Sequence, residues 1–130
     1  MLAACDHAGL ALVPLVAPTS TDERLAAIGA RARGFVYTVS VTGTTGERAG
    51  VAGELPGMLA RVRAHASVPV AVGFGISTPE HAAATADAGA DGVIVGSRLV
   101  RAAAEAADAG EDPAAAVGAA VGELARGLSR

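Results

Sequence analysis

The feature that most constrains the fold is a regular alternation of short apolar runs with alanine-rich segments. The apolar runs are residues 10–16, 34–40, 68–73 and 92–95. Each run is continuously apolar, which is typical of strands that are covered on both faces. Because strands that alternate with helices form parallel sheets with helical crossovers, the sequence predicts an α/β fold of four parallel βα units. Pro14 lies inside the first run and would remove a ladder hydrogen bond, so we expect that strand to be bulged or poorly paired.

Three of the predicted helices carry start signals. Ser20 and Glu23 have the spacing of a capping box at the start of a helix over 21–32. Thr78 and Asp112 each precede a proline, which predicts a cap followed by proline at the first helical position. Two helices also carry an apolar stripe that we expect to face the core. The stripes are Leu55, Met58, Leu59 and Val62 in one helix, and Val117, Val121, Leu124 and Leu128 in the other.

The composition excludes several classes of protein. The chain has 130 residues, a net charge of −3, 52% hydrophobic residues and 2% aromatic residues. This predicts a single domain over 1–130, with no basic surface and too few aromatic rings for nucleic acid. The apolar runs are far shorter than the ~20 residues of a membrane helix, so we expect no membrane span. Cys5 is the one cysteine and no export signal is evident, so the expected location is cytoplasmic.

The number of βα units leaves two architectures open. Four units are about half of a closed eight-stranded barrel of ~250 residues. The first nine residues predict a helix that ends at Gly9 and that neither a cap nor a strand precedes. We therefore expect the chain to start in the middle of an element, and to be either a small open α/β sheet or the back half of a barrel.

The turns that follow the strands are the candidates for a binding site, because parallel α/β folds bind ligands beyond the carboxyl ends of their strands. Residues 73–77 and 96–97 combine glycines with hydroxyl groups. Glycines let the backbone approach a ligand, and amides at a helix start carry partial positive charge, so these turns suit a phosphate. Turns of this kind are also common without any ligand. The first of them lacks the third glycine of a dinucleotide-binding motif.

The segment 41–53 is a long connection with four glycines and three threonines. Loops of this length are usually lids, binding loops or disordered segments. A mobile lid that closes over a ligand and a flexible linker are both compatible with this composition.

Three motifs, in order and at fixed spacing, resemble the tryptophan synthase alpha chain family. They are Tyr37–Gly46, Gly73–Glu80 and Ala90–Ser97. The resemblance runs along essentially the whole chain and implies the C-terminal half, strands five to eight, of a (β/α)8 TIM barrel. It also implies a lyase of tryptophan biosynthesis that cleaves indole-3-glycerol phosphate to indole and glyceraldehyde 3-phosphate. The family passes indole to a tryptophan synthase beta chain in an alpha2-beta2 assembly; pyridoxal phosphate belongs to that beta chain, so no cofactor is expected in this chain.

The resemblance also assigns roles to individual residues. It gives the substrate phosphate, largely through backbone amides, to Gly46, Gly75, Gly96 and Ser97. It places Tyr37 near the glycerol portion, Phe74 beside the phosphate and indole, and Thr45 in the closing loop. Many members carry a basic residue at the position of Val41, so any contact made by that side chain is missing here.

No catalytic residue is assigned to this chain. The family's retro-aldol cleavage needs an acid and a base, and the carboxylates in these roles lie upstream of the aligned region. No acidic residue of this chain falls at the carboxyl end of a predicted strand, and Glu47 in the candidate lid is more simply a solvated acid. The histidines have no metal-ligand spacing, so no metal site is expected. We expect phosphate binding without turnover unless another polypeptide completes the barrel.

Three interpretations follow. The chain is the C-terminal half of an alpha chain, as a fragment, a truncated gene model or a gene remnant. Alternatively, it is a self-associating phosphate-binding half-barrel, because strand edges and apolar faces invite association. The third interpretation is another phosphate-binding βα-barrel protein of amino-acid or cofactor biosynthesis. Residues 37–46 argue against this last one, because the phosphate turns that such barrels share do not require that segment.

Overall fold

The computed structural model of the chain describes residues 2–39, 48–73 and 75–129. The described strands form one parallel sheet in the order β1-β2-β3-β4. This confirms the predicted α/β fold of four parallel strands. The elements, in chain order, are α1 (Leu2–His7), β1 (Leu15–Val16), α2 (Asp22–Gly29), β2 (Val36–Val39), α3 (Arg48–His65), β3 (Val70–Gly73), α4 (Pro79–Asp87), β4 (Gly92–Ile94), α5 (Ser97–Asp108) and α6 (Pro113–Arg126).

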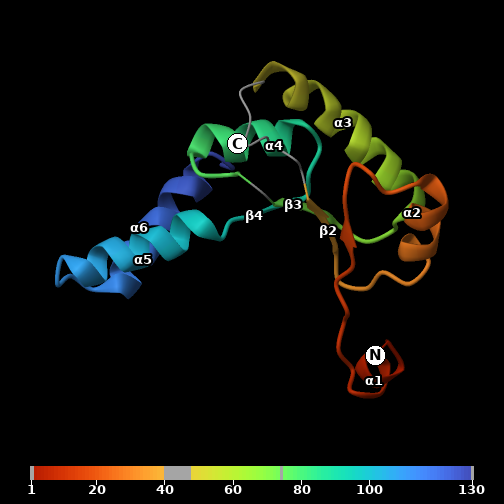
Figure 1. The fold of residues 1–130 in the computed structure, drawn as a ribbon, viewed down its shortest axis with the longest axis horizontal. Helices are drawn as coiled ribbons and strands as arrows, with labels where there is room; N and C mark the ends of the chain where they lie inside the picture. The colour runs from red at the N-terminus through yellow and green to blue at the C-terminus, as the bar shows by residue number, and fades with distance from the viewer. Residues whose placement is uncertain (1, 40–47, 74, 130) are drawn as a thin grey trace.

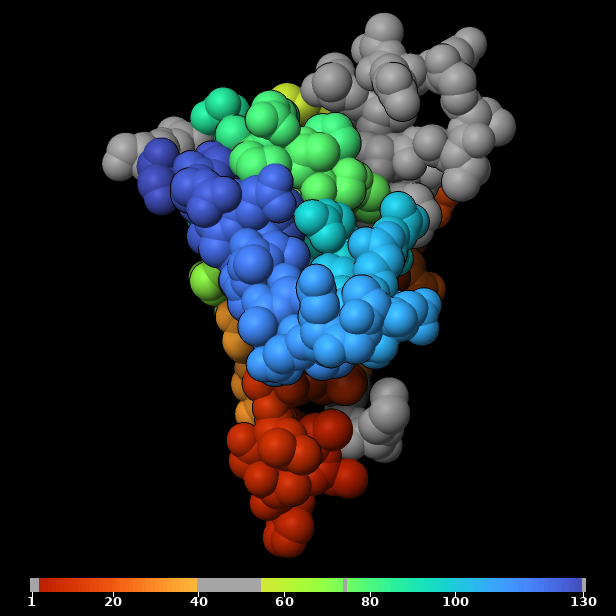
Figure 2. All heavy atoms as spheres, turned by 90° about the vertical axis from the view of Figure 1, so that its left-hand side faces the viewer, coloured from red at the N-terminus to blue at the C-terminus, as the bar shows by residue number. Residues whose placement is uncertain are grey.

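The helices that follow the strands are arranged in an arc around the sheet (Figure 1). α2, α3 and α4 run along it, whereas α5 and α6 lie side by side at one end of the molecule (Figure 2). α1 lies apart, at the end of the extended segment that leads to β1. An ion pair between Asp6 of α1 and Arg33 ties it to the segment before β2.

The two faces of the sheet differ in how far they are buried. Side chains alternate between the faces along a strand, so the strand register sorts them into two sets. The covered face carries the buried side chains Val16, Val36, Thr38, Val70 and Val72. The open face carries Leu15, Tyr37, Val39, Ala71, Gly73, Gly92 and Ile94.

The hydrophobic core lies between the covered face and the helices α2 and α3. The valines of that face pack with Leu25 of α2 and with Met58, Leu59 and Val62 of α3. The apolar stripe that predicted the buried side of α3 is therefore confirmed. On the open face, by contrast, Leu15 is 61% exposed, and Tyr37, Val39, Ala71 and Ile94 are only half-buried.

The first strand is much shorter than the apolar run that predicted it. The prediction covered 10–16, but β1 contains only Leu15 and Val16. Pro14 is where regular pairing begins: its carbonyl accepts a hydrogen bond from the N–H of Tyr37 at 2.9 Å, but it has no N–H of its own to donate. The other strands, predicted over 34–40, 68–73 and 92–95, lie inside those ranges.

The long connection is also shorter than predicted. α3 begins at Arg48, so residues 48–53 are helical although their glycines indicated a loop. The rest of the candidate lid, residues 41–47, lies outside the described residues.

Two of the three predicted helix caps are confirmed. The Thr78 hydroxyl accepts from the N–H of His81 at 3.2 Å, and the Asp112 carboxylate accepts from the N–H of Ala114 at 2.9 Å. The capping box of α2 was wrong, because its cap is Thr21, which accepts from the N–H of Arg24. The Ser20 hydroxyl instead accepts from the N–H of Ala17.

The prediction that the apolar stripe of α6 faces the core is only partly confirmed. Leu124 is buried, but Val121 is 47% exposed and Leu128 is 38% exposed. The buried side of this helix is centred on Ala120 and Leu124, because α6 packs against α5 and α4 rather than against the sheet.

Candidate functional site

The register of the last two strands brings two glycine-containing turns to neighbouring positions. Gly73 at the end of β3 pairs with Ile94 at the end of β4. Gly75 and Gly96 each follow two residues after this pair, so both turns leave the same edge of the sheet. We call this edge the carboxyl edge. Gly75 has a φ of +74°, a backbone conformation in which a side chain would be strained.

The helix that leaves the carboxyl edge after β4 starts without a side-chain cap. Its N-cap residue is Gly96, and no acidic residue lies in its first turn. The N–H groups at the start of an α-helix have no partner within the helix, so the amides of Ser97 and Arg98 are available to a ligand. Together with the partial positive charge of the helix start, they favour an anion at this position.

The helix that leaves the same edge after β3 offers a less favourable place for an anion. α4 begins with the capping hydroxyl of Thr78 and carries Glu80 in its first turn. Hydrogen bonds from the Thr78 side chain and from its own backbone amide lower the pKa of Glu80, so this carboxylate keeps its negative charge. The start of α5 is therefore the better anion site of the two.

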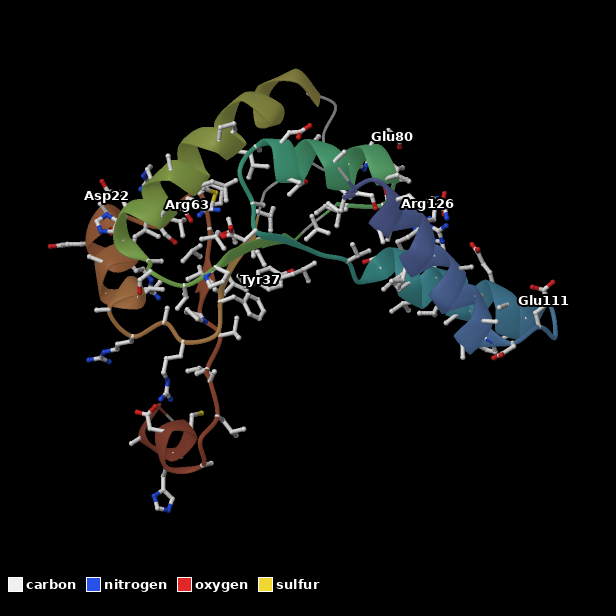
Figure 3. All side chains as sticks on the ribbon, turned by 180° about the vertical axis from the view of Figure 1, so that it is seen from behind. Asp22, Tyr37, Arg63, Glu80, Glu111 and Arg126 are labelled. Carbon is white, nitrogen blue, oxygen red and sulfur yellow. The ribbon has the colours of Figure 1, made fainter. Side chains whose placement is uncertain are left out.

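Tyr37 projects from β2 onto the open face, away from α3 (Figure 3). Its phenol ring reaches the end of the next strand: a methyl group at Gly73 would overlap the Tyr37 hydroxyl and lie 2.8 Å from its Cζ. Ile94 would lie 3.0 Å from the same methyl group. Gly73 is therefore required for Tyr37 to lie beside the carboxyl edge.

None of the sequence motifs had indicated this role for Gly73. A glycine inside a strand often marks a close approach of another group, and this signal could have found it. Of the predicted site residues, the structure places Tyr37, Gly75, Gly96 and Ser97 on the open face or at the carboxyl edge. Gly46, Thr45 and Phe74 lie outside the described residues.

The opposite edge of the sheet, where β3 and β4 begin, is closed by the chain's own groups. We call it the amino edge. The Asp91 carboxylate accepts a hydrogen bond from the N–H of Val70 at 2.8 Å and pairs with Arg63 at 2.9 Å. Arg63 also donates to the carbonyl of Gly89 at 2.6 Å. Both contacts lower the pKa of Asp91: the hydrogen bond from the Val70 amide has the larger effect, and the hydrogen bond from Arg63 has the smaller one.

Two further ion pairs join neighbouring helices. Arg61 of α3 binds Asp22 of α2 at 2.8 Å, which lowers the pKa of Asp22. Arg98 of α5 reaches Glu123 of α6 at 3.4 Å, so its guanidinium is directed along the α5–α6 pair. These ion pairs link neighbouring helices at the surface.

None of the described helices has the length and apolar character that crossing a membrane requires.

Comparison with known proteins relates the whole chain to one family. The family model of the tryptophan synthase alpha chain matches residues 1–129. The tryptophan synthase alpha chain of Acidothermus cellulolyticus is 48% identical over 129 residues, which are 99% of this chain and 47% of that protein. The protein of the same name from Pelobacter propionicus is 60% identical over 87 residues, 67% of this chain and 32% of the relative.

Solved structures show the same relationship in three dimensions. Tryptophan synthase subunit alpha from Legionella pneumophila superposes with a TM-score of 0.82 at 35% identity, over 98% of this chain and 45% of the other. An aminoacrylate-bound form of tryptophan synthase from M. tuberculosis gives a TM-score of 0.77 at 40% identity, over 98% and 44%. The chain thus spans about half or less of the length of the relatives it matches. It belongs to the tryptophan synthase alpha chain family.

Proposed function

We propose that this chain provides the phosphate-binding half of a tryptophan synthase alpha subunit, a lyase that cleaves indole-3-glycerol phosphate to indole and glyceraldehyde 3-phosphate. The observation that carries this proposal is the uncapped start of α5 at Gly96, beside the Gly75 turn. The amides of Gly75, Gly96 and Ser97 would hold the substrate phosphate. Gly46 would contribute from the segment after β2.

The rest of the substrate would extend from the phosphate across the open face. Tyr37 lies on this face with its hydroxyl beside Gly73, which supports its assignment to the glycerol portion. Phe74 would line the phosphate and indole side, and Thr45 would belong to a lid. No acid and base pair is assigned to this chain, so we expect binding without cleavage until the remaining strands of a barrel are supplied.

The partner in this proposal is a tryptophan synthase beta chain that receives the indole and carries the pyridoxal phosphate. The family assignment and the tryptophan synthase structures from M. tuberculosis support such a partner. The loops at the carboxyl edge are where the resemblance places contacts with the beta chain.

Titration calorimetry with indole-3-glycerol phosphate tests the phosphate site. The decisive variant is Ser97→Asp, which puts a negative charge where the phosphate would bind. An acid in the first turn favours the helix itself, so lost binding would not reflect a weakened helix. We expect at least a tenfold loss of affinity, about 1.4 kcal/mol.

The matched control is Ala115→Asp, which adds the same charge to the first turn of α6 at an exposed position. It should bind the ligand as the parent chain does. The dephosphorylated ligand, indole-3-glycerol, should bind far more weakly than the phosphate ester. Equal binding of the two ligands, or undiminished binding by Ser97→Asp, would contradict the proposed phosphate site.

The absence of cleavage by this chain alone is tested by measuring indole release with and without a beta chain. We expect none above the uncatalysed rate in either mixture. Turnover by the purified chain would show that the acid and base are present within these residues.

A further inference from the structure

The end of α6 lies directly against the start of α4 (Figure 1). Gly127, the C-cap of α6, approaches Pro79, the first residue of α4. A methyl group at Gly127 would overlap the carbonyl oxygen of Pro79 and would lie 2.8 Å from its carbonyl carbon and 2.9 Å from its Cα. All three atoms belong to the backbone, so a change of side-chain rotamer could not relieve the overlap. Only glycine therefore permits this approach.

Close contact, and not backbone conformation, is the reason for glycine at this position. Gly127 has a φ of −66°, a value that any residue adopts. Two other glycines of the same helix, Gly118 and Gly122, have open space where a methyl group would stand, with nothing within 4 Å. The requirement is therefore specific to the end of α6, where this helix meets α4.

The contact links the two helices that leave the carboxyl edge. α4 follows the Gly75 turn, and α5 starts after Gly96. α5 packs along α6, with Ala102 and Ala106 of α5 buried, and the end of α6 in turn lies on α4 (Figure 2). α6 therefore joins the two turns on the helix side, just as the pairing of β3 with β4 joins them within the sheet.

We propose that Gly127 is a positioning residue of the phosphate site, because it sets how closely the α5–α6 pair approaches the start of α4. It touches no ligand, and it acts through the separation of the Gly75 turn from the start of α5. A phosphate bound by both turns needs both sets of amides within about 3 Å of its oxygens. A small displacement of one turn therefore weakens the whole site. The inference rests on the proposed function, since it concerns the same phosphate.

Titration calorimetry of Gly127→Ala with indole-3-glycerol phosphate tests this role. The added methyl group would push α6 away from α4, and α5 would move with it. Because charge-assisted hydrogen bonds depend on short distances, we expect a loss of affinity of about fivefold or more. Gly122→Ala in the same helix adds a methyl group that meets nothing within 4 Å, so this variant should bind as the parent chain does.

The matched control for lost stability is Gly29→Ala at the end of α2. A methyl group there would overlap the carbonyl oxygen of His65 and would lie 2.6 Å from its carbonyl carbon, so it too forces two helix ends apart. These ends of α2 and α3 precede β2 and β3, on the side of the sheet away from the phosphate. Gly29→Ala should lose stability in urea but keep its affinity. Equal affinities of Gly29→Ala and Gly127→Ala would overturn the positioning role.

Amide resonances recorded without ligand separate this inference from the proposed function. The N–H signals of Gly75 and Gly96 should shift in Gly127→Ala and stay in place in Gly29→Ala. If the parent chain binds the ester while Gly127→Ala changes neither the affinity nor these signals, the positioning role is wrong and the phosphate site stands. If the parent chain does not bind the ester, the proposed function is wrong, and the positioning role falls with it.

A second variant keeps the test decisive if Gly127→Ala does not fold. Leu124→Val shortens a buried side chain of α6 and adds no group that could overlap α4. It loosens the same helix, so it should weaken binding of the ester and shift the Gly75 and Gly96 signals. Undiminished binding with unshifted signals in a loosened α6 would overturn the positioning role.

Discussion

The amino edge of the sheet and the start of α5 at its carboxyl edge differ in whether their backbone N–H groups are satisfied by a side chain. At the amino edge, Asp91 satisfies the Val70 amide and is itself held by Arg63. At the carboxyl edge, α5 starts at Gly96 with no side-chain cap. Groups that are satisfied within the chain contribute to stability, whereas groups left open are available to a ligand. The two ends of one small sheet can therefore serve folding and binding separately, as in closed barrels of this class.

The largest effect on stability is expected at Gly73, where the ring of Tyr37 lies against the end of β3. Gly73→Ala would force a methyl group against the Tyr37 ring and Ile94, and overpacking of this kind costs up to about 3 kcal/mol. Urea unfolding measures this loss. Most of it should disappear in the Tyr37→Ala background, where the ring is gone.

A control for that substitution is Gly118→Ala, because a methyl group at this helical glycine meets nothing within 4 Å. Alanine is favoured over glycine inside a helix, so the variant should gain about 0.5–1 kcal/mol. If both glycine variants changed stability alike, Tyr37 would not be packed against Gly73.

The next effect concerns the amino edge. Asp91→Ala leaves the Val70 amide without its acceptor and Arg63 without its carboxylate. Loss of a partner for a partly buried donor costs about 1–2 kcal/mol. Thermal unfolding should detect it, and the exposed Asp108→Ala at the end of α5 should show no comparable loss.

The charge at the amino edge also predicts the direction of a pH effect. The pKa of Asp91 is lowered from 3.8 in the folded chain, so folding favours its charged form. The resulting stabilisation is complete above the unfolded pKa and is lost as the pH falls through the lower folded value. Unfolding free energies measured at neutral and acid pH should show this loss, and Asp91→Asn should reduce it. An unchanged acid profile in Asp91→Asn would mean that other carboxylates dominate.

The smallest effect is expected at the carboxyl edge itself. Ser97→Ala changes an exposed side chain at the start of α5, and such surface substitutions usually alter stability by less than about 0.5 kcal/mol. Chemical unfolding is the measurement. A cost as large as that of Asp91→Ala would break the comparison, because the carboxyl edge would then be structural as well.

The sequence predicted those features whose cause is local. The caps of α4 and α6 were found because a hydroxyl or a carboxylate stands directly before a proline at the start of each helix. The cap of α2 was misassigned to Ser20, because Ser20 and Thr21 are adjacent and both can cap. The choice between them depends on a hydrogen bond to Ala17 that the spacing does not reveal.

Features that depend on distant neighbours were predicted less well. Val121 and Leu128 belong to an apolar stripe, but what α6 packs against decides which part of the stripe is buried. The turns at Gly75 and Gly96 were identified from their motifs. The contact of Tyr37 with Gly73 was not, since it joins two strands across a ladder whose register the sequence does not state.

The order of the strands in the sheet is the order of the strands in the chain. Each strand therefore lies beside the one that precedes it, and a new strand with its helix could be added at either edge without rethreading the rest. A fold of this kind is modular: duplication of a gene segment that encodes whole units would widen the sheet. Such a fold can evolve through changes in the number of its βα units while the connections between the units stay the same.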